Sequence, residues 1–245
     1  MSILLEQLNN NQISRVEFLS SLADTKSKNL KKILKKLPAE YVDDIDVLKI
    51  ILKRSAILFK YIPEKHKTNM DLIKICAHRY CDLIDNLSDE LKLNKKVVLA
   101  CVKNKSFKVA KIPESLMNDL EVVHHYINIH GYYYLNQFPE ASNNFEFIKL
   151  YVSDNKNVFF YAGKTIQTNA EYVLEILKID YSIIEMVGSC FDSDKEFLYR
   201  AQEMNPEKFA KSYFQKFFEM FKKEDALRDK LIDKPVSDNY TRKKI

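Results

Sequence analysis

The sequence has few of the residues that build turns, cross-links and membrane spans. Only three glycines occur among 245 residues, so the chain has no Gly-rich loop for phosphate and little of the turn chemistry of a β-protein. Four cysteines, at 76, 81, 101 and 190, are too few and too irregularly spaced for a disulfide framework. No run approaches eighteen apolar residues, and the start MSILLEQLNN has no secretory signal. These absences predict a cytoplasmic protein without a membrane span, with secretion into a host cell left open.

What is present is a large apolar fraction and an uneven charge. The chain is 46% hydrophobic and 12% aromatic, enough for a substantial core. The net charge of +5 is unevenly distributed. Residues 43–117 hold 15 basic and 10 acidic residues, whereas residues 118–192 hold 4 and 10. The first of these stretches is therefore basic and the second acidic.

A period of 25 residues runs through the chain. Six of seven equally spaced positions can cap the N-terminus of a helix, and an acidic residue follows three positions later in all but the third repeat. The positions are Asp43, Thr68, Leu93, Asn118, Asn143, Thr168 and Ser193. The pattern predicts helices that begin at these residues, with Asn94 as an alternative in the third repeat. It also predicts capping boxes at Thr168–Glu171, Ser193–Glu196 and Ser14–Glu17.

Apolar columns keep the same period. Apolar residues stand four, five and eight positions after each cap, which is one face of a helix. A second column, 16 positions after the cap, predicts a second helix in each repeat and holds Phe59, Ile84, Val109, Tyr134, Phe159, Ile184 and Phe209. A helix pair of this length cannot bury its apolar face alone and must stack on its neighbours. The sequence therefore predicts an all-α fold, a right-handed superhelical solenoid of short two-helix repeats.

The predicted organisation has four parts. Residues 1–42 form a divergent N-terminal capping unit, and residues 43–217 form seven tandem repeats. Asn205-Pro206 begins a closing helix, marked by Phe209, Tyr213, Phe217 and Phe221. Residues 218–234 are the end of this C-terminal capping helix, and residues 235–245 are a disordered basic tail.

The third repeat resembles a known family. NKKVVLACVKN at 94–104, followed by IPESL at 112–116, is similar to the helical repeat called domain of unknown function 4116. The resemblance covers roughly residues 43–217, without the family's Gly after Asn104 and with weakly matching ends. It implies the helical-repeat fold and transfers no catalytic residue. Family members occur in bacteria, protists and large viruses, which makes a bacterial origin one expectation.

Two groups of chemically reactive residues have a structural interpretation. His66, Cys76, His78 and Cys81 fit no standard zinc spacing, and Cys76 falls in a core column, so a buried structural thiol is expected. The tyrosines beside His124, His125 and His130, namely Tyr126, Tyr133 and Tyr134, also fall in core columns. No metal, cofactor or catalytic residue is therefore predicted, and the chain is not expected to be an enzyme.

Basic residues recur in the turn after each first helix of the basic half. They are Lys53 and Arg54, His78 and Arg79, and Lys103 and Lys105. Equivalent positions in stacked repeats form a stripe, which we predict to bind a partner. The alternative is that these cations only complement the helix dipole.

A further column mixes polar and apolar residues. Ile57, Phe107 and Tyr132 belong to it, and we predict that they are exposed and contact a partner, as exposed aromatic residues often do. The alternative is packing against a turn between helices.

These features predict a scaffold that binds a macromolecule. The leading hypothesis is interaction with a protein partner, as in an effector or inhibitor that captures another protein. The alternative is nucleic-acid binding through the basic N-terminal half, against which the acidic half argues. The lysines at 31, 32, 35 and 36 are interpreted as a solvated helix face rather than a membrane contact.

Overall fold

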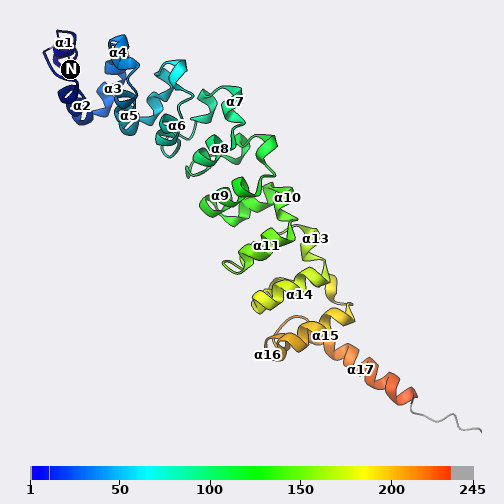
Figure 1. Cartoon of the computed structure of the whole chain (residues 1–245). Helices are drawn as coiled ribbons and strands as arrows, with labels where there is room; N and C mark the ends of the chain where they lie inside the picture. Colours follow the sequence, from blue (N-terminus) through cyan, green and yellow to red (C-terminus); the bar gives the residue numbers. More distant parts are fainter. Residues whose placement is uncertain (1, 11, 233–245) are drawn as a thin grey trace, which may run out of the picture. The chain divides into compact units, whose positions relative to one another are not determined.

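The chain folds into helices. The computed structural model describes residues 2–10 and 12–232, and within these ranges every regular element is an α-helix or a 3₁₀-helix (Figure 1). The predicted tail, 235–245, lies outside the described residues. The chain divides into two compact units, residues 1–138 and 139–245. No helix within the described ranges is long and apolar enough to cross a membrane.

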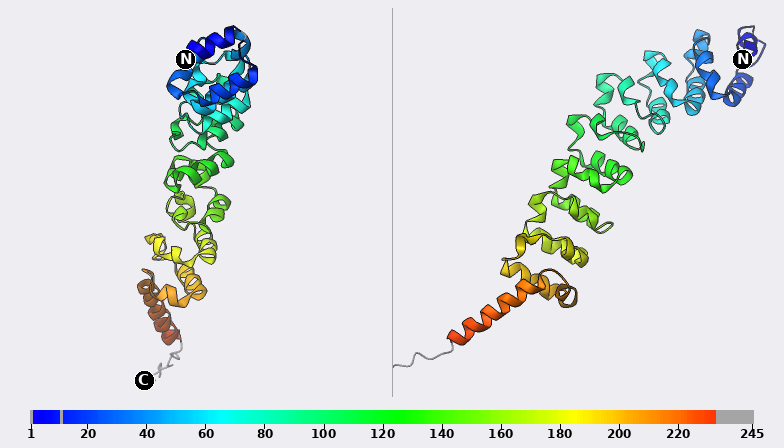
Figure 2. Two further views of the ribbon diagram at one scale, coloured as in Figure 1. Left: turned by 90° about the vertical axis from the view of Figure 1, so that its left-hand side faces the viewer. Right: turned by 180° about the vertical axis from the view of Figure 1, so that it is seen from behind.

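The N-terminal unit is a succession of short helices, each followed by shorter helical turns. Figure 2 shows from two further sides that the longer helices follow one another side by side. Its elements are α1 (Ser2–Asn9), α2 (Arg15–Asp24), α3 (Ser27–Leu34), α4 (Ala39–Val42), α5 (Ile45–Arg54), η1 (Ala56–Tyr61), η2 (Glu64–His66), α6 (Met70–Ala77), η3 (Ile84–Asn86), α7 (Asp89–Lys92), α8 (Lys95–Val102), η4 (Val109–Lys111), η5 (Glu114–Leu116), α9 (Leu120–His130) and η6 (Tyr132–Gln137).

The C-terminal unit continues the same alternation and ends in a longer helix. Helix α11 contacts α14, and α14 contacts α15. Its elements are α10 (Pro139–Ser142), α11 (Phe145–Val152), α12 (Asn157–Phe160), α13 (Lys164–Gln167), α14 (Ala170–Ile179), η7 (Tyr181–Met186), η8 (Ser189–Phe191), α15 (Lys195–Met204), α16 (Pro206–Ala210) and α17 (Gln215–Ile232).

The helix caps keep the 25-residue period but stand one residue later than predicted. Every cap in the series is Asp or Asn, and its side-chain oxygen accepts from backbone N–H groups of the first turn. The caps are Asp44, Asn69, Asn94, Asp119, Asn144, Asn169 and Asp194. The caps predicted at 168 and 193 were therefore wrong, because the neighbouring Asn169 and Asp194 take that position. The capping box at Ser14–Glu17 is confirmed.

Each of the first six repeats holds three helical segments rather than the two predicted. A first helix of 8 to 11 residues is followed by a helical turn of 3 to 6 residues and by a third segment of 3 or 4 residues. The residue before the third segment is extended in six cases, with φ between −56° and −75°, whereas Phe138 before α10 has a φ of −121°. Proline favours this conformation, and the position holds Pro38, Pro63, Ser88, Pro113, Gly163 and Gly188. The third segment could have been found from these prolines, which share the 25-residue spacing.

The predicted first-helix columns are largely buried, and the second-helix column is buried except for the half-buried Val109 and Tyr134. All residues of the columns five and eight positions after the predicted caps have at most 4% of their surface exposed. In the column at four positions, Val97 and Val122 are fully buried, Phe147 is 6% exposed and Tyr172 is half-buried. Within each unit, consecutive first helices therefore bury one apolar face against each other and against the turns that follow.

Helix α9 shifts the register of its repeat by one residue. It runs to His130 and ends at Gly131, whose φ of +109° is the left-handed region that favours glycine. As a result Leu135 is fully buried, while Tyr133, predicted to be in the core, is 51% exposed. The extra helical residue thus moves each following side chain by one position.

The C-terminal end begins as predicted and is then interrupted. Asn205 caps α16, with Pro206 in its first turn, but the chain leaves the helix before α17 begins at Gln215. Tyr213 lies in this break and is 50% exposed, so the spacing of four between its aromatic residues does not mark one continuous helix. Helix α17 extends to Ile232, and residues 233 and 234 lie outside the described ranges.

Candidate interaction surface

The C-terminal ends of the first helices lie side by side in the N-terminal unit. Arg54 Nη2 donates to the carbonyl of Thr25 at the end of α2 (3.2 Å), and Arg79 Nη1 donates to the carbonyl of Lys53 at the end of α5 (2.7 Å). The last carbonyls of a helix have no partner within the helix. The two arginines therefore satisfy acceptors of the preceding repeat and hold neighbouring helices in register.

The same contact continues with other side chains. Asn104 Nδ2 donates to the carbonyl of Ala77 (3.0 Å), and His130 Nε2 lies 3.1 Å from the carbonyl of Val102. Asn104 is buried, and it replaces the cation found at this position in the two earlier repeats. Sequence reasoning did not recognise Asn104 as part of this series, although it follows Arg79 by 25 residues.

The rest of the predicted stripe lies along the same edge. Lys53 stands in the last turn of α5, His78 and Lys103 cap the ends of α6 and α8, and Lys105 lies in the turn after α8. All four side chains are exposed, and within the described ranges none of them forms an ion pair or a side-chain hydrogen bond. The structure thus brings all six predicted residues to one edge, which we call the basic edge: Lys53, Arg54, His78, Arg79, Lys103 and Lys105.

The opposite ends of the same helices are neutralised. Arg15 pairs with Asp44 (2.7 Å) and Asp46 (2.9 Å). Lys49 pairs with Asp71 at 3.2 Å. In these pairs a cation of one repeat meets a carboxylate at the start of the next first helix. The carboxylates near the helix starts are therefore matched within the N-terminal unit.

Helices α8 and α9 show the same arrangement. Lys95 pairs with Asp119 (2.8 Å) and Glu121 (2.7 Å). The hydrogen bonds that Lys95 donates to Asp119 and Glu121 raise the pKa of Lys95. Burial opposes ionisation of Asp119, but Lys95 and two backbone N–H groups outweigh it and lower the pKa of Asp119. The carboxylates at these helix starts are thus neutralised by ion pairs, in contrast to the unpaired cations of the basic edge.

An apolar column lies between the matched starts and the basic edge. Ile50, Ile75 and Ala100 occupy equivalent positions on α5, α6 and α8, and each is half-buried. Lys74 is exposed one position before Ile75 and has no ion-pair partner among the described residues. The exposed face of these helices therefore combines apolar surface with unpaired positive charge.

The three predicted aromatic and aliphatic anchors differ from one another. Ile57 is 50% exposed and Tyr132 is half-buried. Phe107 was predicted to be exposed but is only 2% exposed. In its repeat α8 ends early and Asn104 turns the chain inward, with Phe107 N donating to the Asn104 carbonyl (2.9 Å). Phe107 therefore fills core space, and it is excluded as a contact residue.

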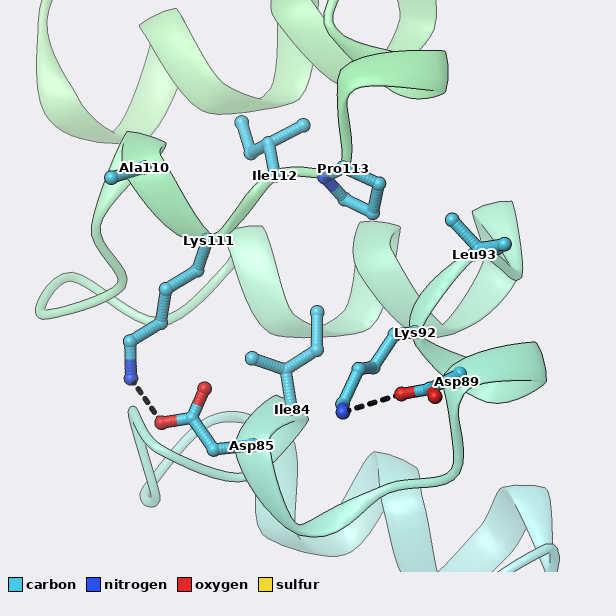
Figure 3. A pocket seen from close by; sticks show the side chains of 9 residues that line it. All are labelled: Ile84, Asp85, Asp89, Lys92, Leu93, Ala110, Lys111, Ile112 and Pro113. Carbon is cyan, nitrogen blue, oxygen red and sulfur yellow. Dashed lines mark hydrogen bonds and ion pairs between the residues drawn. The ribbon is translucent and has the colours of Figure 1, made fainter.

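A separate cavity of about 460 Å³ lies between η3, α7 and η4 (Figure 3). Its apolar wall includes Ile84 and Ile112. The charged residues of its lining are all in ion pairs: Lys111 contacts Asp85 at 2.7 Å, and Lys92 contacts Asp89 at 2.8 Å. Because each charge already has a partner, this cavity offers no unpaired acid or base for catalysis.

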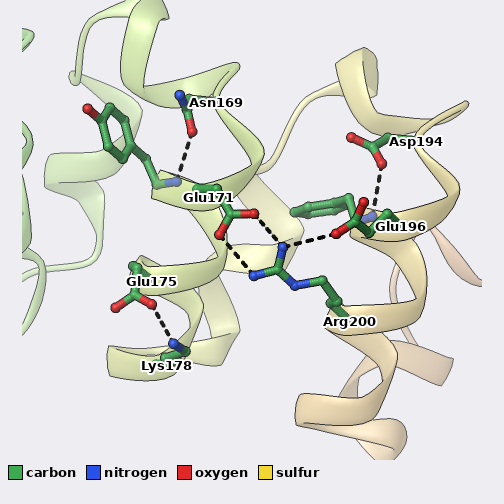
Figure 4. A network of polar contacts seen from close by, with 9 residues as sticks. Asn169, Glu171, Glu175, Lys178, Asp194, Glu196 and Arg200 are labelled. Carbon is green, nitrogen blue, oxygen red and sulfur yellow. Dashed lines mark hydrogen bonds and ion pairs between the residues drawn. The ribbon is translucent and has the colours of Figure 1, made fainter.

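On α14 and α15 of the C-terminal unit, acidic residues are paired with basic residues of the same face. Figure 4 shows Arg200 of α15 between Glu171 of α14 and Glu196 of its own helix. Arg200 Nη2 donates to Glu171 Oε2 at 2.9 Å, and this bond lowers the pKa of Glu171. Glu175 pairs with Lys178 on the same face. This face therefore lacks the charge excess of the N-terminal unit.

Burial shifts the pKa values of Cys76 and His125. Cys76 is fully buried, as predicted, and burial raises the pKa of its thiol to about 12, so it stays protonated at neutral pH. The pKa of His125 is lowered by burial, by the neighbouring His124 and by Lys103. Within the described ranges no three His, Cys, Asp or Glu residues are placed to hold a metal ion.

Comparison with known proteins identifies no relative. No family model matches the sequence, and no curated protein or solved structure is significantly similar to it. The resemblance to domain of unknown function 4116 therefore remains a prediction, which covers roughly residues 43–217 and is closest at residues 94–104 and 112–116.

Proposed function

We propose that the chain is a helical-repeat scaffold that binds a protein partner and is not an enzyme. In this proposal the repeats form a right-handed superhelical solenoid, and the basic edge with the apolar column Ile50, Ile75 and Ala100 binds an acidic, partly apolar segment of the partner. A crystal structure of the full chain would test the handedness and the continuity of the solenoid.

The observation that carries the proposal is the contrast between the two ends of the first helices. At the starts of α5, α6 and α9 the carboxylates meet cations of the preceding repeat. At the ends of α5, α6 and α8, Lys53, His78 and Lys103 have no carboxylate partner within the described ranges. Cations at helix ends are favourable on their own, but a partner with carboxylates at this spacing would add charge complementarity.

Lys53, Lys74 and Lys103 are the residues to substitute. Arg54 and Arg79 bond to carbonyls of the preceding repeat, so replacing them would also disturb packing. The three lysines are exposed and unpaired in the described structure. Their replacement by Glu should leave the fold intact, which circular dichroism would check.

The experiment compares capture of proteins from a lysate of the native organism by the wild type and by Lys53→Glu/Lys74→Glu/Lys103→Glu, quantified by mass spectrometry. A matched control is Lys164→Glu/Lys223→Glu/Lys230→Glu, which makes the same charge change at exposed positions of the C-terminal unit. For the captured partner we expect binding by the first variant to weaken at least ten-fold, about 1.4 kcal/mol, and binding by the control to stay unchanged. Equal binding by all three proteins would reject the surface.

The second candidate is nucleic-acid binding through the same basic edge. It is favoured by the unpaired cations and opposed by the acidic stretch 118–192, with 10 acidic and 4 basic residues. Binding to phosphates falls steeply with salt, because each neutralised phosphate releases counterions. Titration with duplex DNA and single-stranded RNA at several salt concentrations would decide: a steep slope supports this function, and no binding at low salt eliminates it.

A further inference from the structure

Three lysines converge on one tyrosine at the junction between α3 and η1. The ammonium nitrogens of Lys31, Lys60 and Lys35 lie 4.6, 5.3 and 5.7 Å from the centroid of the Tyr61 ring. Lys31 is in the last turn of α3 and Lys35 is its C-terminal cap, whereas Lys60 and Tyr61 end η1. We call these four residues the tyrosine–lysine cluster.

The positive charge of the tyrosine–lysine cluster is not balanced by ion pairs within the described part of the chain. None of the three lysines forms an ion pair there. The charged groups that act on Tyr61 are all lysines: Lys31 lowers the pKa of Tyr61 most, and Lys60 and Lys35 act in the same direction. The three cations thus lie close to one phenol ring and repel one another.

An equivalent junction two repeats later shows how the chain balances such a site. Lys111 stands 50 residues after Tyr61 and also ends the second segment of its repeat. It contacts Asp82 and Asp85 of the preceding repeat, the latter at 2.7 Å, as seen for Asp85 in Figure 3. At Lys111 one cation therefore meets two carboxylates. At Tyr61, by contrast, Lys31 and Lys35 of the preceding segment meet a phenol and a third lysine, Lys60.

We propose that the tyrosine–lysine cluster binds a phosphoryl group. A phosphoryl group carries up to two negative charges and several acceptor oxygens, which matches three ammonium groups and one hydroxyl donor. Lysine binds phosphate as a mobile point charge, and the exposed positions of all three lysines leave the approach open. This site is distinct from the basic edge, which lies on the first helices.

The test uses the full chain and inorganic tripolyphosphate at low ionic strength, with binding measured by isothermal titration calorimetry. The cluster variant is Lys31→Gln/Lys35→Gln/Lys60→Gln. Its matched control is Lys28→Gln/Lys32→Gln/Lys36→Gln, which removes the same charge from exposed lysines of the α3 region that do not contact Tyr61. We expect the cluster variant to bind at least ten-fold more weakly than the wild type and the control to stay within two-fold.

A second measurement locates the ligand. The ring signals of Tyr61, assigned by comparison with Tyr61→Phe in NMR spectra, should shift on titration in the wild type and in the control. Equal weakening in both lysine variants, or ring signals that do not move, would mean that only net charge attracts the anion and would overturn the proposal.

A vesicle experiment distinguishes the source of the phosphoryl group. Phosphatidylcholine vesicles with and without phosphatidic acid are sedimented with the wild type and both variants. Co-sedimentation that needs phosphatidic acid and is lost only in the cluster variant assigns the site to a lipid headgroup. Tripolyphosphate binding without co-sedimentation assigns it to a soluble phosphate, and failure of both ligands to bind rejects the site.

Discussion

At the scale of single residues, helix caps are the clearest test of the repeat. Asp194 Oδ1 accepts from Phe197 N at 2.9 Å, whereas the adjacent Ser193 is exposed and is not the cap. Loss of an Asp cap destabilises a protein by about 0.5–2 kcal/mol. We therefore expect Asp194→Ala to lower the free energy of unfolding by about 1 kcal/mol and Ser193→Ala to leave it nearly unchanged. Urea denaturation of both variants would measure this, and equal effects would contradict the assignment of Asp194.

Phe107 and Ile57 provide a second test at this scale, which concerns the burial of the predicted contact residues. Both were expected on the surface, but Phe107 is 2% exposed and Ile57 is 50% exposed. Phe107→Ala should cost about 3–5 kcal/mol because it removes a buried ring and leaves a cavity. Ile57→Ala should change stability by only about 0.5 kcal/mol. Thermal denaturation would compare the two losses of stability. A larger loss for Ile57→Ala than for Phe107→Ala would contradict the burial of Phe107.

At the scale of the element, the sequence predicted the period and the buried face more accurately than the boundaries. Apolar columns locate the inside of a helix because burial requires them in every repeat. The cap was misplaced by one residue because Asn143 and Asn144 can both cap, and only the backbone geometry decides between them. The third segment was missed because its signal is a single proline, serine or glycine before three or four residues.

The candidate surface was predictable only in part. Lys53, His78 and Lys103 were found because they recur after each first helix. Their neighbours Arg54 and Arg79 look identical in the sequence, yet they bond to carbonyls of the preceding repeat. The side-chain geometry between repeats decides which cation bonds to the chain itself and which stays unpaired. The spacing of residues in the sequence does not reveal this geometry.

The ion pairs between helices predict a pH dependence. Arg200 lowers the pKa of Glu171 below its usual value of 4.5. A carboxylate with a lower pKa in the folded state contributes stability that is present above its unfolded pKa and is lost as pH falls through the folded pKa. Glu171→Gln should therefore reduce Tm slightly at pH 7, and this difference should vanish in acid.

Glu146 is the matched control for this experiment. It occupies the position of Glu171 one repeat earlier, is exposed and has no ion-pair partner in the described ranges. Glu146→Gln should leave Tm unchanged across the same pH range. If both variants behaved alike, the pair with Arg200 would contribute nothing to stability, as is the case for many exposed ion pairs.

At the scale of the whole molecule, contacts join elements that are close in sequence. Helix α5 packs on α6, α6 on α8 and α8 on α9 in the N-terminal unit, and α14 on α15 and α15 on α17 in the C-terminal unit. In the proposed solenoid, stability would be a sum over repeats and their nearest neighbours rather than a property of one central core. A local defect should therefore have a local effect.

Leu198 allows this to be tested, because it is fully buried in α15. Leu198→Ala should cost about 2–5 kcal/mol by leaving a cavity, and the loss should fall on the elements that pack against α15. We expect hydrogen exchange, measured by mass spectrometry, to accelerate in α14, α15 and α17 and to stay unchanged in α5 and α6. Val98→Ala, at the equivalent buried position of α8, should give the converse pattern, with α6, α8 and α9 affected. Uniform acceleration along the chain in both variants would instead show one cooperative domain, in which the partner surface and the C-terminal helix could not be altered independently.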